Sequence, residues 1–222
     1  MDKLAQIRRR QMDRALRWSL LLFFGFLLVT QQVLTNGPLV AYDKEINSQP
    51  KPQFEGLAGF TLRRLDDLGL RSLTATVLLI AASFIAYKFK TWRPLNLAMI
   101  SLLSLNLVVG TFKIVLGRTK PRDGFDLLHA GGMSYPSGHA SNAVLSWGIL
   151  AYLIYRYAKV DRYQGRLATT GVVLISLTVC VVSLIRHTHW FSDLLGGLFV
   201  GSALLVAVIA IDRYVPSKSQ LH

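Results

Sequence analysis

The sequence of 222 residues contains a single cysteine, Cys180, which lies inside a long apolar run. An internal disulfide is therefore excluded, and cysteine usage indicates no redox compartment. Acidic residues are also scarce, because 12 Asp and Glu stand against 25 Lys and Arg, for a formal net charge of +13. The sequence shows no internal repeat, low-complexity tract or soluble domain, which excludes a repeat or modular architecture.

Apolar residues, by contrast, make up 52% of the chain and occur in blocks. A bilayer core about 30 Å thick needs about 20 helical residues per crossing, and six segments approach that length. We therefore expect an all-α fold, a polytopic membrane helical bundle of about six transmembrane helices formed by one domain, residues 1–222. The six predicted segments are Trp18–Leu34, Leu70–Tyr87, Leu95–Leu116, His139–Tyr157, Leu167–Ile185 and Leu194–Ile211.

The positive charges cluster beside these segments, in residues 1–17, 88–93 and 156–166. The positive-inside rule explains this alternation, so nucleic acid is not expected as a partner. Both termini are predicted to be cytoplasmic, in a multi-pass protein of the cytoplasmic (inner) membrane. No small-x-small cleavage site follows Val29, and the first segment is predicted to be an uncleaved anchor.

The longest polar connection, residues 36–69, is then predicted to be extracytoplasmic. Within it Leu57, Thr61, Leu65 and Leu68 fall on one helical stripe, which predicts a short interfacial helix. Such a helix either covers the bundle or caps the site and gates lipid entry. The loops 117–138 and 186–193 fall on the same side by alternation, so the active surface is expected to face away from the cytoplasm.

Three polar clusters lie on that side. The first reads KIVLGRTKPR, in which Gly117 is predicted to end a helix and Pro121 to begin a turn. Its dense positive charge suits an anionic ligand or, alternatively, a collar that contacts lipid headgroups. The four cations are Lys113, Arg118, Lys120 and Arg122.

The second cluster reads YPSGHAS and precedes an apolar helix. Ser137 is predicted to be the N-cap, with Gly138 in the first turn and His139 beside it. A helix N-terminus offers free backbone N–H groups and a positive dipole end, and glycine permits close approach of an oxyanion. This cluster therefore predicts an anion-binding site.

The third cluster, IRHTHWFSD, places His189 four residues before Asp193. On one helix face the carboxylate reaches the second ring nitrogen, fixes the tautomer and makes the histidine a good nucleophile or base. His187 is interpreted as a polar loop residue. Gly197 and Gly201, which follow, predict a small-residue face for close helix packing.

Neither a metal site nor another cofactor is expected. His187 and His189 are two residues apart and cannot share a helix face, and the sequence has no HExxH motif or cysteine pair. The surrounding Lys and Arg would repel a cation. The chemistry that suits these groups is phosphoryl transfer through a phosphohistidine, with His189 attacking phosphorus and His139 protonating the leaving oxygen.

In this order and at these helix ends, the clusters resemble the motifs of the type 2 phosphatidic acid phosphatase family: K-x6-R-P, P-S-G-H and S-R-x5-H-x3-D. The second motif and the H-x3-D part of the third match in full. The resemblance implies a metal-independent membrane enzyme of six helices, with His189 as nucleophile, Asp193 as its partner and His139 as general acid. The chain departs from the pattern at three positions, where it has Lys120 for arginine, and Val182 and Ser183 for the Ser-Arg pair.

We therefore expect a lipid phosphate or pyrophosphate phosphatase, whose partners are the bilayer and a lipid such as undecaprenyl pyrophosphate, phosphatidylglycerophosphate or phosphatidic acid. A lipid phosphotransferase that uses the same phosphohistidine and a non-catalytic lipid-binding relative are the alternatives. Arg186, one helical turn after Ser183, is hypothesised to restore the phosphate clamp together with Arg118 or Arg122. The residues predicted to bind phosphate are Lys113, Arg118, Lys120, Arg122, Ser137, Gly138 and Arg186.

Overall fold

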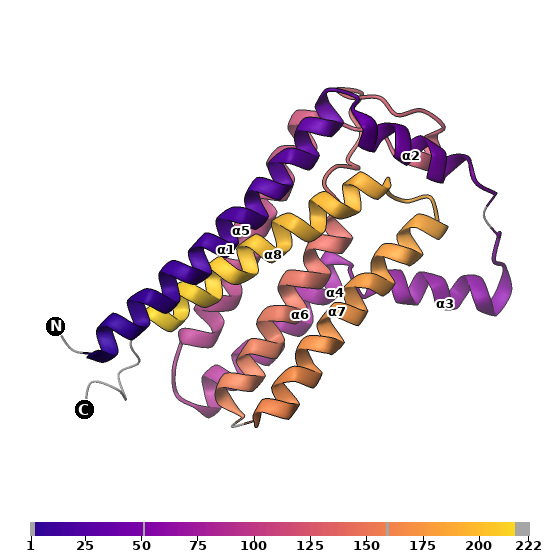
Figure 1. The fold of residues 1–222 in the computed structure, drawn as a ribbon. Coiled ribbons are helices and arrows are strands. Elements are labelled where there is room, and N and C mark those ends of the chain that lie inside the picture. The colour runs from indigo at the N-terminus through magenta and orange to yellow at the C-terminus, as the bar shows by residue number, and fades with distance from the viewer. Residues whose placement is uncertain (1–2, 51, 159, 216–222) are drawn as a thin grey trace.

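The structure, a computed structural model, describes residues 3–50, 52–158 and 160–215, and its regular elements in these ranges are all helical. The expectation of an all-α bundle is confirmed. Six long helices build the bundle, while two shorter helices and one 3-10 turn lie in the connections (Figure 1). In chain order they are α1 (Lys3–Leu34), α2 (Pro38–Ser48), α3 (Gly56–Asp67), α4 (Arg71–Lys88), α5 (Arg93–Leu116), η1 (Pro121–Asp123), α6 (Gly138–Tyr157), α7 (Arg162–Ile185) and α8 (Phe191–Tyr214).

The long helices coincide with the six predicted segments within a few residues at most ends. The exception is α1, which begins at Lys3 rather than at Trp18. The basic segment and the first apolar run therefore form one continuous helix. No Gly or Pro separates them, and the Ala, Leu, Arg and Gln residues of the segment are good helix formers.

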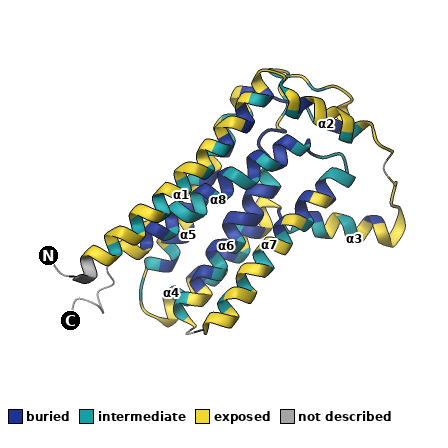
Figure 2. Ribbon diagram, in the orientation of Figure 1, coloured by how far each residue is buried: buried dark blue, intermediate teal, exposed yellow. Residues whose placement is uncertain are grey.

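Five helices in the described ranges, α1, α4, α5, α7 and α8, are long and apolar enough to cross a membrane. The sixth long helix, α6, has 20 residues, which is also long enough, but it carries buried polar residues such as Ser141, Asn142 and Ser146. It packs against α4, α5, α7 and α8, and Figure 2 shows how much of it is buried. Because neighbouring helices rather than lipid surround it, a central helix tolerates this polar content.

The N-terminal turns of α6 and α8 pack closely against each other. A Cβ added to Gly197 would lie 2.6 Å from the Ser137 carbonyl oxygen, and one added to Gly201 would lie 2.8 Å from that of Ser141. These separations confirm the predicted small-residue face. Along its other side α8 runs beside α1 for much of its length (Figure 1).

The connection between α1 and α4 holds two helices, of which only α3 was predicted. Pro38 at the first turn of α2 is a common helix start, and Val40 and Asp43 form its buried face. Helix α2 packs against α1 and α8, whereas α3 packs against α7. The interfacial position of α3 stays a prediction.

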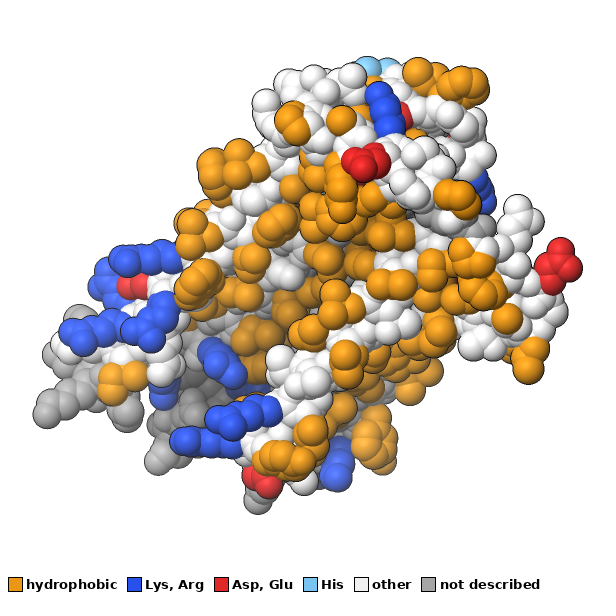
Figure 3. All heavy atoms as spheres, turned by 45° about the vertical axis from the view of Figure 1, so that its right-hand side comes forward, with side chains coloured by type: hydrophobic (Ala, Val, Ile, Leu, Met, Phe, Trp, Pro, Cys, Tyr) orange, Lys and Arg blue, Asp and Glu red, His pale blue; other side chains and the backbone are white. Residues whose placement is uncertain are grey.

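Large apolar side chains cover the middle of the bundle, and most Lys and Arg visible in Figure 3 lie at the end where α1 begins. Leu107 and Ile114 on α5, for example, are 71% and 75% exposed. A surface of this kind suits contact with lipid. The cytoplasmic location of the termini stays a prediction, and the last residues, 216–222, lie outside the described ranges.

Candidate active site

A cleft of about 240 Å³ lies where α5 ends and α6 begins, beside the loop that precedes α8. Five of the predicted site residues line it, although three different parts of the chain supply them. They are Lys113, Lys120, Gly138, His139 and His189.

His189 lies just before α8 and is 5% exposed. Its Nδ1 faces the Asp193 Oδ2 at 3.4 Å, and its ring centroid lies 6.0 Å from that of His139. Because the carboxylate is an acceptor, Nδ1 carries the proton of the neutral ring and Nε2 keeps its lone pair. The arrangement fits a nucleophilic Nε2 with a second histidine close by.

Asp193 is buried in the first turn of α8, and several donors hold its carboxylate. Its Oδ2 accepts a hydrogen bond from the Trp190 backbone N–H at 2.9 Å and from the Ser134 hydroxyl, and its Oδ1 accepts from Arg118 at 2.8 Å. Each donor favours the ionised carboxylate. Asp193 is thereby fixed in the orientation that serves His189.

Arg118 is fully buried, and carboxylates surround its guanidinium. It forms two bonds with Asp126, at 2.7 and 2.8 Å, and single bonds with Asp43 and Asp193, both at 2.8 Å. It also donates to the Ser192 hydroxyl at 2.7 Å. Arg118 therefore contacts Asp193 on the side away from the cleft and does not line the cleft.

The start of α6 has the predicted capping geometry. The Ser137 hydroxyl accepts a hydrogen bond from the Ala140 N–H at 3.2 Å, so Ser137 is the N-cap. Its own N–H donates to the Asp193 carbonyl at 2.9 Å, which ties α6 to α8. A Cβ on Gly138 would approach only Lys113 Cε, at 3.7 Å, so this turn is open to a ligand.

Positive charge lines the cleft opposite the carboxylates. The Lys113 ammonium donates to the backbone carbonyls of Met133 and Ser134, and Lys120 lies nearby in the lining. Burial lowers the pKa of His189, the hydrogen bond with Asp193 partly opposes this, and the two lysines lower the pKa further. His189 therefore stays neutral to a lower pH than an ordinary histidine does, which suits the predicted role of nucleophile.

The structure does not bring the other two predicted arginines into the cleft. Arg186 pairs with Asp66 at the end of α3 and lines a separate pocket of about 290 Å³. Asp66 also accepts a hydrogen bond from the Ser183 hydroxyl at 2.9 Å, so these residues tie α3 to α7. Arg122 is largely exposed beside Asp123. The hypothesis that Arg186, Arg118 or Arg122 completes the clamp gains no support from these positions.

The sequence pattern missed two sets of residues around the site. The first set forms hydrogen bonds with Arg118 or Asp193, and the second set lines the cleft itself. Pro38, a common first residue of a helix, is a signal that could have located the helix carrying Asp43, but no local pattern indicates which residues Asp43 pairs with. The sets are Asp43, Asp126, Ser134 and Ser192, and Arg71, Asn106 and Asn142.

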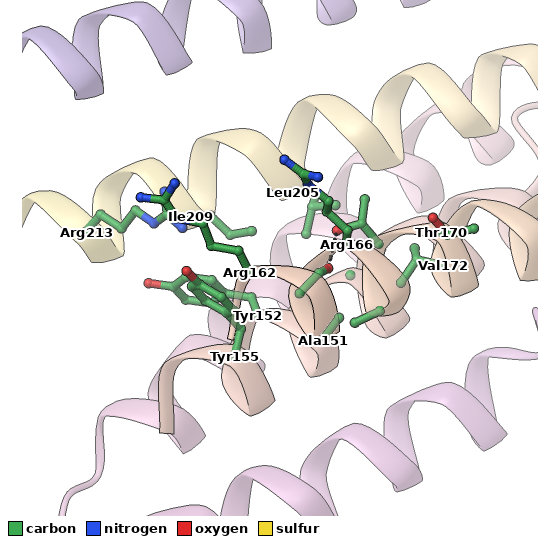
Figure 4. A pocket seen from close by; sticks show the side chains of 14 residues that line it. Ala151, Tyr152, Tyr155, Arg162, Arg166, Thr170, Val172, Leu205, Ile209 and Arg213 are labelled. Atoms are coloured by element: carbon green, nitrogen blue, oxygen red, sulfur yellow. Dashed lines mark hydrogen bonds between the residues drawn. The ribbon is translucent and has the colours of Figure 1, made fainter. Parts of the chain in front are cut away.

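A larger cavity of about 700 Å³ lies elsewhere, between α6, α7 and α8 (Figure 4). Arg162, Arg166 and Arg213 line it together with tyrosines and small or apolar residues. None of the predicted site residues lies in its lining. The two histidines predicted to be catalytic, His139 and His189, line the smaller cleft instead. Within the described residues, no group of three or more His, Cys, Asp or Glu could hold a metal ion.

Comparison with known proteins agrees with this geometry. Phosphatidylglycerophosphatase B of Bacillus subtilis (strain 168) is 23% identical over 201 residues, which cover 87% of this chain and 94% of that protein. The crystal structure described as the first transmembrane PAP2 type phosphatidylglycerolphosphate phosphatase from Bacillus subtilis shares the fold, with a TM-score of 0.79 at 22% identity over 90% of this chain and 98% of that one. The family model of the PAP2 superfamily matches residues 73–216. The chain therefore belongs to the PAP2 superfamily, as a helical membrane phosphatase.

Proposed function

We propose that the protein hydrolyses a lipid phosphate or diphosphate through a phosphohistidine on His189, without a metal. The observation that carries this proposal is the single cleft in which His189, His139 and two lysines meet at the start of α6. Asp193, fixed by four donors including His189, orients the nucleophile from behind.

In the first step Nε2 of His189 attacks phosphorus, and the bond between phosphorus and the lipid oxygen breaks. His139 gives its proton to that oxygen, while Lys113, Lys120 and the N–H groups of the first turn of α6 stabilise the phosphoryl oxygens. In the second step water attacks the phosphohistidine and His139 takes the proton of the water. Inorganic phosphate leaves, and His189 is regenerated.

The name of the similar Bacillus subtilis protein, phosphatidylglycerophosphatase B, makes phosphatidylglycerophosphate the first substrate to test. Phosphatidic acid and undecaprenyl pyrophosphate remain in the same panel. The distribution of Lys and Arg supports an inner-membrane protein whose cleft faces the extracytoplasmic side.

The test is a phosphate-release assay in detergent across these three lipids, with EDTA present and no acceptor lipid. We expect release from at least one lipid, unaffected by EDTA and abolished by His189→Ala. Acid quenching of the unchanged protein with radiolabelled substrate should trap acid-labile phosphate on the chain. Activity that EDTA removes, or that persists in His189→Ala, would contradict the mechanism, and release only with an acceptor lipid would indicate phosphotransfer instead.

A further inference from the structure

The cleft extends beyond the catalytic histidines along α5. Lys113, Gly110 and Asn106, spaced three and four residues apart, lie on one face of the helix and line it. A Cβ added to Gly110 would meet nothing within 4 Å, so this wall is open. The helix rises about 10 Å from Lys113 to Asn106. The cleft is therefore longer than one phosphate group requires.

Its far end contains a polar pair that the catalytic chemistry does not use. Arg71, the first residue of α4, donates to the Asn106 side-chain oxygen at 3.2 Å, and both residues are exposed. The neighbouring Leu103 and Leu107 are exposed apolar residues, as expected on a lipid-facing helix. An amide among lipid-facing side chains requires a polar partner, which Arg71 supplies here.

Arg71 differs from the other arginines near the site in its partner. Arg118 and Arg186 are paired with carboxylates, whereas Arg71 contacts a neutral amide, and within the described residues no carboxylate pairs with it. It is also the arginine that lines this cleft in the part of the chain described. Its charge is therefore available to an anion that enters there.

Asn142 lies between the two ends of the cleft. It is one helical turn beyond Gly138, about 6 Å further along α6. Its side chain is 5% exposed and donates to the Gly138 carbonyl at 2.7 Å, while its Oδ1 is buried without a hydrogen-bond partner among the described residues. Because buried acceptors are nearly always paired, this oxygen is a candidate acceptor for a donor that a ligand brings into the cleft.

We propose that Arg71, Asn106 and Asn142 form a second subsite, which reads the part of the headgroup between the scissile phosphate and the acyl chains. Arg71 binds a second phosphate, and the Asn142 Oδ1 accepts a hydrogen bond from a hydroxyl that lies between the two phosphates. This inference rests on the proposed function and narrows its substrate class to glycerophospholipids in which a glycerol unit joins a terminal phosphate to a phosphodiester.

The spacing separates this class from the other candidates. A terminal phosphate held by Lys113 and Lys120 leaves a glycerol unit beside Asn142 and a phosphodiester within reach of the arginine fork. In a diphosphate the two phosphates are adjacent, and both would lie near the lysines. Phosphatidic acid has no second phosphate, so Arg71 would gain no partner from its headgroup.

The decisive experiment compares Arg71→Gln with the unchanged protein on phosphatidylglycerophosphate and on phosphatidic acid with the same acyl chains. A lost charge-assisted contact should lower kcat/KM for the first lipid by about tenfold or more, and for the second by less than about twofold. Asn142→Leu should act in the same direction by a smaller factor. Arg64→Gln is the matched control, because Arg64 is exposed and pairs with Asp67 away from the cleft.

An equal loss on both lipids would show that Arg71 merely joins α4 to α5, and no loss on either would also overturn the subsite. Binding gives an independent answer. In a His189→Ala background, phosphatidylglycerophosphate should raise the unfolding temperature more than phosphatidic acid does, and adding Arg71→Gln should remove the difference. If the unchanged protein releases phosphate from none of the three lipids in the panel, the proposed function fails. The binding difference, whether present or absent, decides the subsite separately.

Discussion

Two clusters of Arg and Asp, one at each end of the bundle, contain the same residue types in opposite ratios. Near the cleft, Asp43, Asp126 and Asp193 surround the single guanidinium of Arg118. At the other end, Arg93 and Arg156 share the single carboxylate of Asp212. The first cluster therefore has an excess of negative charge and the second an excess of positive charge.

The ratio explains what each cluster does. Behind His189 the excess carboxylates balance the lysines in front of it, and one of them orients the imidazole. At the other end Asp212 also accepts a hydrogen bond from Tyr152 at 2.6 Å and joins the start of α5 to the ends of α6 and α8. The role of an arginine near such a site is thus indicated by the groups that it pairs with, rather than by its charge alone.

Breaking the first cluster should have the largest effect. Arg118→Met leaves three buried carboxylates without their cation, which should lower the free energy of unfolding by about 3–5 kcal/mol. Phosphate release should fall at least about a hundredfold even where the variant is folded, because Asp193 loses a positioning partner. Thermal unfolding in detergent and kinetics below the transition would measure both.

Arg118→Lys keeps the charge without the planar fork and should lie between the two proteins in both measurements. A variant with unchanged stability and a raised KM alone would mean that Arg118 contacts the substrate, contrary to its buried position.

Breaking the second cluster should affect stability alone. Asp212→Asn keeps the shape of the side chain but removes the carboxylate that two partly exposed arginines share. We expect a loss of about 1–3 kcal/mol in the free energy of unfolding, with kcat within about twofold of its original value. A large loss of kcat at full folding would show that the two ends of the bundle are coupled.

The smallest expected effect is a shift in the pH dependence of kcat/KM, caused by a change in the positive charge near His189. The pKa of His189 is lower than that of an ordinary histidine, so the proposed nucleophile stays neutral to a lower pH. The acidic limb of kcat/KM should therefore lie below about pH 6.5. Lys120→Met removes one cause of that lowering, which raises the pKa of His189 and moves the limb to higher pH. The measurement is kcat/KM against pH, with Asp212→Asn as a control whose limb should not move.

Local patterns predicted much of the fold and the central part of the site. Blocks of apolar residues located the six long helices, and a serine before an apolar run located the cap of α6. The spacing of four between His189 and Asp193 predicted their contact, although the shared helix face was wrong: His189 precedes α8, and Asp193 faces it from the first turn of that helix. These features depend on residues close in sequence.

The features that were missed depend on distant residues. Asp43 meets Arg118 across 75 positions of sequence, and Arg71 meets Asn106 across 35. No periodicity encodes which charged residues will pair when helices pack. For that reason the dense positive charge around Arg118 suggested a phosphate ligand, although carboxylates surround Arg118 in the folded chain.

Helix α2 lies outside the segment that matches the family model, which begins at residue 73. Yet Asp43 on this helix holds Arg118 and the start of α8, and the turn at Gly69 lies so close to His139 that an added Cβ would be 2.7 Å from its carbonyl oxygen. A chimera that exchanges only residues 73–216 between relatives would keep both histidines but separate them from these supports. The smallest transplantable unit of this enzyme therefore begins before α2.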